Sequence, residues 1–121
     1  MVTMDIPTAI KSYQFGERAK SGLIVASQLA MALADFPDQE RPGGRRMLLL
    51  LMESVRSEIQ FAANSTGNPS FNKAIDALNE GISLIESNQP QQASEKLAKA
   101  ISASTTPAQE AWQVLSGHGL L

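Results

Sequence analysis

Apolar residues recur at steps of three and four along most of this chain, which is typical of amphipathic helices. Clusters of proline, glycine and asparagine interrupt this pattern at four places, where turns are expected. The sequence has no run of strictly alternating apolar and polar residues long enough for a strand. The pattern therefore predicts five helical segments, over residues 7–36, 43–64, 70–88, 90–104 and 107–116.

The connections between these segments are short, so consecutive helices should pack side by side and antiparallel. We expect an all-α fold, a mostly antiparallel helical bundle of four main helices plus a short C-terminal helix. With 121 residues, of which 43% are hydrophobic, the chain can bury one core as a single domain over residues 1–121. Gly16 and Gly22 lie inside the first segment, where they indicate close approach of a neighbouring helix or a kink, or else a gap that faces a ligand.

The composition argues against several classes of function. The chain has no cysteine, which excludes disulfides, cysteine-based metal centres and a thiol nucleophile. Its net charge of −2 gives no general attraction to nucleic acid or to anionic lipid. The apolar run Met47–Met52 is much too short to span a bilayer, and Met1–Asp5 has no secretory signal pattern. We therefore expect a cytoplasmic protein with no nucleic-acid or membrane partner.

Residue types that support catalysis are sparse. His118 is the only histidine, and the sequence lacks the second histidine or cysteine of a metal-ligand pair. Neither a nucleophile elbow nor a phosphate-binding glycine-rich loop is present in the sequence. The sequence therefore predicts no enzyme activity, no metal site and no cofactor.

An arginine-rich segment precedes the second predicted helix. Three of the five arginines, Arg41, Arg45 and Arg46, fall within six residues, beside Gly43 and Gly44. Backbone N–H groups at a helix N-terminus, together with guanidinium groups, can hold a phosphate or a carboxylate. The segment is therefore a candidate contact for an anion or an acidic partner. The alternative is a solvated turn whose charges are balanced by the acidic residues just before it.

Leu49 and Leu50 give the second predicted helix a wider apolar surface than one core stripe requires. A helix that is apolar nearly all round must be covered on more than one side. Two arrangements satisfy this requirement. Either this helix is the central one of the domain, or Leu49 and Leu50 belong to a homodimer interface.

Small and large apolar residues have a regular spacing in the second half of the chain. Ala93 comes twelve residues after Gly81, Leu97 follows four residues later, and Ala100 three residues after that. Residues 74–107 thereby resemble a single tetratricopeptide repeat, a helix–turn–helix unit of 34 residues. The resemblance implies a hairpin that binds peptides or proteins and has no catalytic activity. The segment is then either a true repeat or a repeat-like hairpin within a bundle.

Three functions follow from these observations. The first is a non-catalytic protein–protein interaction module, a small adaptor or chaperone-like helical protein that associates with a protein partner or with itself. The second is a small-molecule or anion binder that uses the segment Arg41–Arg46. The third, an enzyme, has no group of residues to support it. We expect the first.

Overall fold

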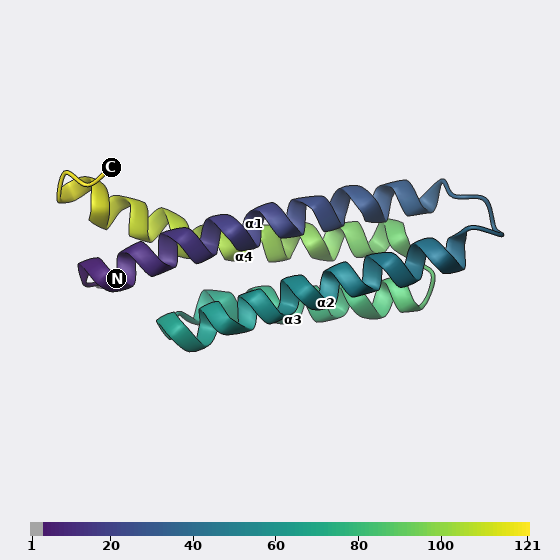
Figure 1. Cartoon of the computed structure of the whole chain (residues 1–121), viewed down its shortest axis with the longest axis horizontal. Coiled ribbons are helices and arrows are strands. Elements are labelled where there is room, and N and C mark those ends of the chain that lie inside the picture. The colour runs from purple at the N-terminus through teal and green to yellow at the C-terminus, as the bar shows by residue number, and fades with distance from the viewer. Residues whose placement is uncertain (1–3) are drawn as a thin grey trace.

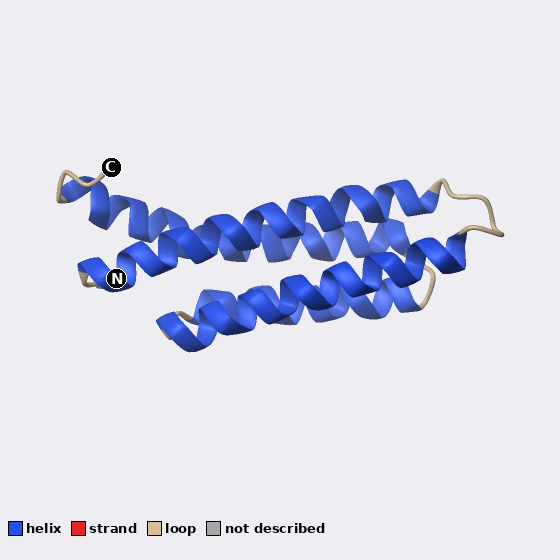
Figure 2. Cartoon of the chain, viewed as in Figure 1, coloured by secondary structure: helices blue, strands red, loops and turns tan. Residues whose placement is uncertain are grey.

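The computed structural model describes residues 4–121, which form four α-helices joined by three short connections (Figures 1 and 2). All regular secondary structure in these residues is helical, so the predicted all-α class is confirmed. The helices are α1 (Ile6–Ala34), α2 (Arg41–Thr66), α3 (Pro69–Glu86) and α4 (Pro90–Gly117).

Each helix packs antiparallel against the next one along the chain, and α4 returns to lie along α1 (Figure 1). The principal neighbours of α1 are therefore α2 and α4, and those of α3 are the same two helices. This is an up-down-up-down bundle, which short connections favour. Both ends of the described chain lie at the same end of the bundle (Figure 1).

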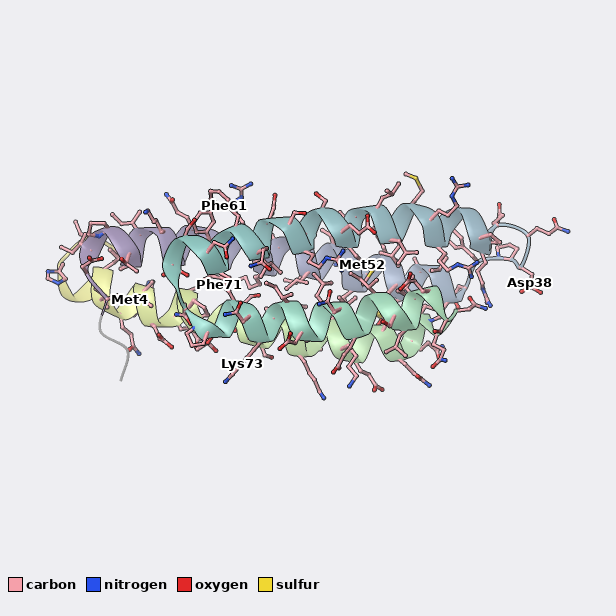
Figure 3. All side chains as sticks on the ribbon, turned by 90° about the horizontal axis from the view of Figure 1, so that it is seen from below. Met4, Asp38, Met52, Phe61, Phe71 and Lys73 are labelled. Carbon is pink, nitrogen blue, oxygen red and sulfur yellow. The ribbon has the colours of Figure 1, made fainter. Side chains whose placement is uncertain are left out.

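The core lies between the four helices, and each helix contributes its apolar stripe to it. Met52 on α2 and Phe71 on α3 are fully buried and point between the helices, whereas Lys73 points away from them (Figure 3). The largest fully buried apolar side chains of this core are Leu23, Met52, Ile59, Phe71, Leu78, Ile85 and Leu97.

The helix ends follow from local side-chain chemistry. The carboxylate of Asp5 accepts a hydrogen bond from the backbone N–H of Thr8 and caps α1. Gly67 has a positive φ of 66° and ends α2, a conformation that glycine adopts without steric cost. The side chain of Asn68 then accepts from the N–H of Ser70 and caps α3. These caps allow α2 to turn into α3 within two residues.

α1 packs tightly against its neighbours at its two internal glycines. Gly16 is buried, and a Cβ atom built there would lie 2.9 Å from the Cβ of Ala108 and 3.1 Å from the carbonyl oxygen of Ser104. A Cβ at Gly22 would lie 3.0 Å from a methyl carbon of Val55 on α2. The interpretation of these glycines as points of close helix approach is therefore confirmed.

The N-terminal part of α1 and the C-terminal part of α4 extend beyond α2 and α3 as a helix pair (Figure 1). Met4, Ala9, Ala111 and Leu115 form a second, smaller apolar cluster between them, which we call the terminal cluster. The last turns of α4 are thus held by α1 alone.

The predicted break at Pro107 does not occur. Residues 107–116, expected as a separate fifth helix, are the last turns of α4, and Pro107 is buried inside that helix. An internal proline costs a backbone hydrogen bond and crowds the preceding turn, at about 3 kcal/mol. Packing against α1 on both sides of Pro107 offsets this cost, because Ser104 and Ala108 both lie against Gly16 and the terminal cluster follows. α4 bends in this region (Figure 1).

The other boundaries differ from the prediction by a few residues. α2 begins at Arg41 rather than at residue 43, because Pro42 fits the first turn of a helix, where its missing N–H is not needed. α1 ends at Ala34, two residues before the predicted end, and Asp35 donates its N–H back to the carbonyl of Ala32.

Candidate functional site

The outer side of the α1–α2 pair carries several large apolar side chains that the bundle leaves uncovered. The most exposed is Met47 at 70%, followed by Leu50 at 63%. Monomeric proteins seldom leave a wide contiguous apolar surface in water unless it serves an interaction. We call this surface the α1–α2 face; it consists of Val25, Leu29 and Ala32 on α1, Phe36 just after the end of α1, and Met47, Leu50, Leu51 and Phe61 on α2. Phe15 and the Arg18–Glu58 pair lie beside Phe61 and form its charged half.

The α1–α2 face has the spacing of a helix-packing seam. On α1 its residues follow one another at steps of four and three from Val25 to Ala32, and Phe36, just past the end of the helix, follows after four more. These positions lie beside the core positions Leu23, Ala26 and Ala30, so α1 carries two adjacent apolar stripes. A stripe with alternating steps of three and four is the surface that one helix presents to another. The core uses the first stripe, and the second is free within the described chain.

The two halves of the α1–α2 face differ in depth and chemistry. Near the ends of α1 and α2 that meet at the first connection, a groove of about 510 Å³ runs between the helices. The side chain of Phe36 lies close to the backbone of Gly44, since a Cβ there would be 2.8 Å from its ring. The nine residues that line the groove are all apolar or glycine: Val25, Leu29, Ala32, Leu33, Phe36, Gly44, Met47, Leu48 and Leu51.

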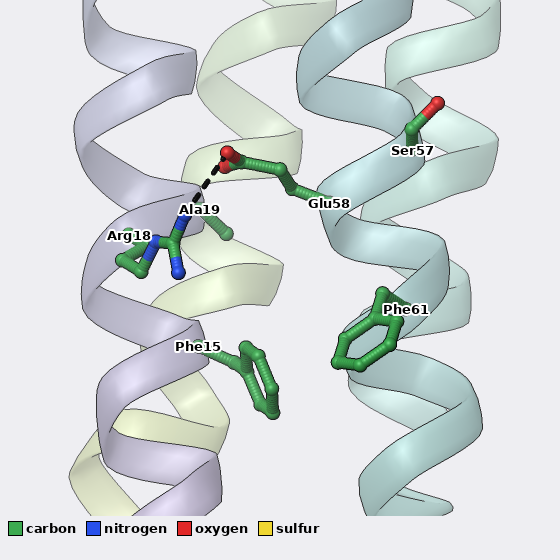
Figure 4. Close-up of a pocket in the computed structure, with 6 residues that line it drawn as sticks. All are labelled: Phe15, Arg18, Ala19, Ser57, Glu58 and Phe61. Atoms are coloured by element: carbon green, nitrogen blue, oxygen red, sulfur yellow. Dashed lines mark hydrogen bonds and ion pairs between the residues drawn. The ribbon is translucent and has the colours of Figure 1, made fainter.

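The opposite half of the α1–α2 face ends in a smaller pocket of about 320 Å³ (Figure 4). The rings of Phe15 on α1 and Phe61 on α2 meet edge to face, with centroids 5.6 Å apart. One turn further along, the Arg18 guanidinium donates to a carboxylate oxygen of Glu58 over 3.2 Å (Figure 4). Both charged side chains are largely solvent-exposed, so this ion pair adds little to stability and remains free to contact a partner.

The structure separates the two predicted interface residues. Leu49 is half-buried and packs against the core, whereas Leu50 is exposed on the α1–α2 face. Consecutive helical residues point about 100° apart, so the two leucines cannot share one surface. α2 packs mainly against α1 and α3, and so it is not the central helix that the sequence allowed.

The three arginines do not form one cluster, because they lie on the first two turns of α2 rather than in a loop. Arg41 is half-buried, and its guanidinium donates to the carbonyl oxygen of Ala34 at the end of α1 over 3.0 Å. Arg45 lies one turn later on nearly the same side, while Arg46 is exposed and points about 140° away from Arg41. None of the ion pairs found within residues 4–121 includes these three arginines.

Arg41 nevertheless lines a polar pocket at the end of the bundle. The pocket has a volume of about 310 Å³ and also contains the α3–α4 connection and the first residues of α4. The Nε atom of Arg41 is buried there without a hydrogen-bond partner in the described part of the chain. α4 begins without a side-chain cap, so backbone N–H groups are available beside Arg41.

Other chemistry is sparse in the part of the chain that the structure describes. His118 follows the end of α4 and is exposed. Among residues 4–121 no group of three or more histidine, cysteine, aspartate and glutamate side chains is placed to hold a metal ion. Within that same range, every helix is too short or too polar to cross a membrane.

Comparison with known proteins adds nothing to this description: no family model, no curated protein and no solved structure matches the chain. The fold and its sites therefore define a class only at the level of an all-α protein with a four-helix arrangement and an uncovered apolar face. Any function has to be argued from that face and from the pocket beside Arg41.

Sequence reasoning found only part of the α1–α2 face. It singled out Leu50. The steps of three and four in the first segment, however, place Leu29 and Phe36 in one apolar stripe with Leu23, so that neither they nor Val25 and Met47 were expected to be exposed. A finer signal was present in the helical direction of these residues: at 100° per residue, Val25, Leu29 and Phe36 point about 120–160° away from the core residue Leu23.

Proposed function

We propose that this protein is a non-catalytic protein–protein interaction module, a small adaptor or chaperone-like helical protein that acts in the cytoplasm. The α1–α2 face is the observation that carries the proposal. Its exposed side chains together present roughly 600 Å² of apolar surface, most of it at the groove near Phe36 and the rest beyond the Arg18–Glu58 pair at Phe61, which is comparable with the largest patches found on monomers. Helices with such a face bind other helices or apolar segments by burying it.

The composition of the α1–α2 face supports a macromolecular partner over a small molecule. The groove near Phe36 is long, open and uniformly apolar, without the few convergent polar groups that orient a small ligand. Aromatic and methionine side chains, which are enriched at the centres of protein interfaces, stand on it at Phe36, Met47 and Phe61.

The α3–α4 hairpin is a further part of this proposal. Ala93, Leu97 and Ala100 are fully buried, and α3 and α4 pack against each other along much of their length. A repeat-like hairpin would bind peptides or proteins, which agrees with the proposed function.

Site-specific photo-crosslinking in the cells that express the protein tests the proposal. A photoreactive amino acid replaces Leu50 on the α1–α2 face, and a matched chain carries it at Met31, which is equally exposed but lies on the other side of α1. We expect protein adducts from position 50 and few or none from position 31. Equal labelling at both positions, or no adduct at either, would refute the interaction function.

A second candidate function is anion binding at the pocket beside Arg41. The unpartnered Nε of Arg41 is the specific observation in its favour, since a buried guanidinium N–H normally has an acceptor. Titration with inorganic phosphate, followed by amide chemical shifts, tests this function. Saturable shifts at the start of α4 that disappear in Arg41→Gln, with Arg46→Gln as the exposed control, would support it; no shifts would remove it.

A further inference from the structure

We infer that the α1–α2 face binds a second copy of this chain, in a symmetric dimer whose two-fold axis runs parallel to the helices. The inference rests on the proposed interaction function and names the partner. Three observations carry it: the area of the face, its lack of charge over the apolar half, and the position of the Arg18–Glu58 pair.

The area of the α1–α2 face suits a small homodimer. A stable interface buries about 800 Å² on each partner, and the exposed apolar side chains of the face already present roughly 600 Å². Half-buried Leu51 and Phe15, together with the Arg18–Glu58 pair, surround these side chains and supply additional area. Two copies can therefore form a standard interface without structural change.

The apolar halves of two copies can face each other without charge repulsion. Every residue of its groove is apolar or glycine, so two identical copies placed face to face oppose no like charges there. A net charge of −2 on each chain adds little long-range repulsion. On each copy α1 contributes an apolar stripe with steps of three and four, the spacing with which one helix packs against another.

The charged half of the face favours one of two possible directions of the two-fold axis. In a two-fold dimer the same patch of each copy faces the other. The direction of the two-fold axis then decides which residue of one copy faces which residue of its partner. An axis parallel to the helices lays α1 of one copy over α2 of the other at the same height. Arg18 of each copy then faces Glu58 of its partner, and the four charges alternate in sign.

The perpendicular arrangement is disfavoured by the same pair. An axis across the helices would lay α1 over α1 in opposite directions. The ion pair would then cover the apolar groove near Phe36 and Met47. Placing the exposed ion pair on an apolar surface removes its water without bringing any further opposite charge to it.

Sedimentation equilibrium of the purified chain tests the dimer. At concentrations on the order of 100 μM we expect the mass of two chains, twice 13.0 kDa. Met47→Glu should weaken self-association at least tenfold, because it puts a charge in the centre of the apolar half. Met31→Glu is the matched control, a similarly exposed methionine away from the face, and should leave the dimer unchanged. Circular dichroism verifies that both variants remain helical.

A mixing experiment tests the symmetry. Arg18→Glu makes the charged half entirely negative and Glu58→Arg makes it entirely positive, so each variant alone should dimerise more weakly than the natural chain. An equimolar mixture should form a heterodimer that is at least tenfold tighter than either homodimer. A mixture that associates no more tightly than its components would overturn the parallel arrangement.

The failure of this inference can be told apart from failure of the interaction function. A natural chain that remains monomeric on the order of 100 μM overturns the second copy as occupant. In that case, crosslinked adducts at position 50 still support the interaction function if their peptides come from another protein. Adducts whose peptides come from this same chain support both.

Discussion

Replacing Gly16 by alanine measures how much of the fold depends on close packing between α1 and α4. The added Cβ would lie 2.9 Å from the Cβ of Ala108, 3.1 Å from the carbonyl oxygen of Ser104 and 3.2 Å from the backbone nitrogen of Ala108. Carbon atoms in contact normally stay about 3.5–4.0 Å apart. Two of the three atoms belong to the backbone of α4 and cannot rotate away. The two helices must therefore separate by several tenths of an ångström.

The net effect follows from two opposing terms. Alanine is favoured over glycine inside a helix by about 1 kcal/mol. Forcing an extra methyl group into a well-packed contact costs about 1–3 kcal/mol. We therefore expect Gly16→Ala to lower the free energy of unfolding by up to about 2 kcal/mol, or by up to roughly 10 °C in Tm for a domain of this size.

Gly43→Ala is the matched control for this substitution. Gly43 is helical and lies in the first turn of α2, and a Cβ there would meet nothing within 4 Å. Only the helix-propensity term remains, so this variant should be more stable than the natural chain by about 0.5 kcal/mol. Urea unfolding followed by far-UV circular dichroism, at one fixed protein concentration, compares the three proteins. A Gly16→Ala chain as stable as the Gly43→Ala chain would refute the argument for close packing.

Three further substitutions test other parts of the structure. Gly81→Ala should raise the unfolding free energy by about 1 kcal/mol in the same urea assay, because its Cβ would make ordinary contacts of 3.5 Å with Leu97; a loss of stability would contradict this. Ser104→Ala should raise the unfolding free energy by about 1 kcal/mol, since the buried hydroxyl has no hydrogen-bond partner within the described chain. A lower unfolding free energy would mean that the hydroxyl has a partner. Hydrogen bonds from the side chain and the backbone N–H of Thr8 hold the pKa of Asp5 below its ordinary 3.8. The natural chain should therefore be more stable than Asp5→Ala above pH 3.8, and this difference in unfolding free energy should shrink as the pH falls below that value. Unfolding curves with a constant difference across that range would contradict the cap.

The helices themselves were predictable from sequence because their core stripes are regular and their ends carry strong turn residues. The connection at Gly67 and Asn68 is an example, since the run from Asn64 to Pro69 is rich in residues that favour turns. The continuity of α4 was not predictable. Pro107 is a strong local signal for a helix end, and only the contact of α4 with α1 outweighs it.

The candidate site was only partly predictable for a similar reason. An apolar residue such as Leu29 reads equally well as core or as exposed surface until the neighbours of its helix are known. The surplus of apolar residues in the second helix was visible, but its direction was not: Leu49 turned toward the core and Leu50 toward solvent. Likewise, the spacing of the three arginines suggested one cluster, and the helical path of residues 41–46 spreads them around the axis.

Stability and association are assigned to different sides of α1, which makes them separable by mutation. The side that carries Gly16 faces α4 and tolerates no added volume. The side that carries Val25 and Leu29 lies on the α1–α2 face and is nearly half exposed, so the isolated chain gains little from it. Charge substitutions there should therefore weaken the dimer while the monomer unfolds at an unchanged urea concentration. Gly16→Ala should do the reverse, because the contact it disturbs lies wholly within one chain.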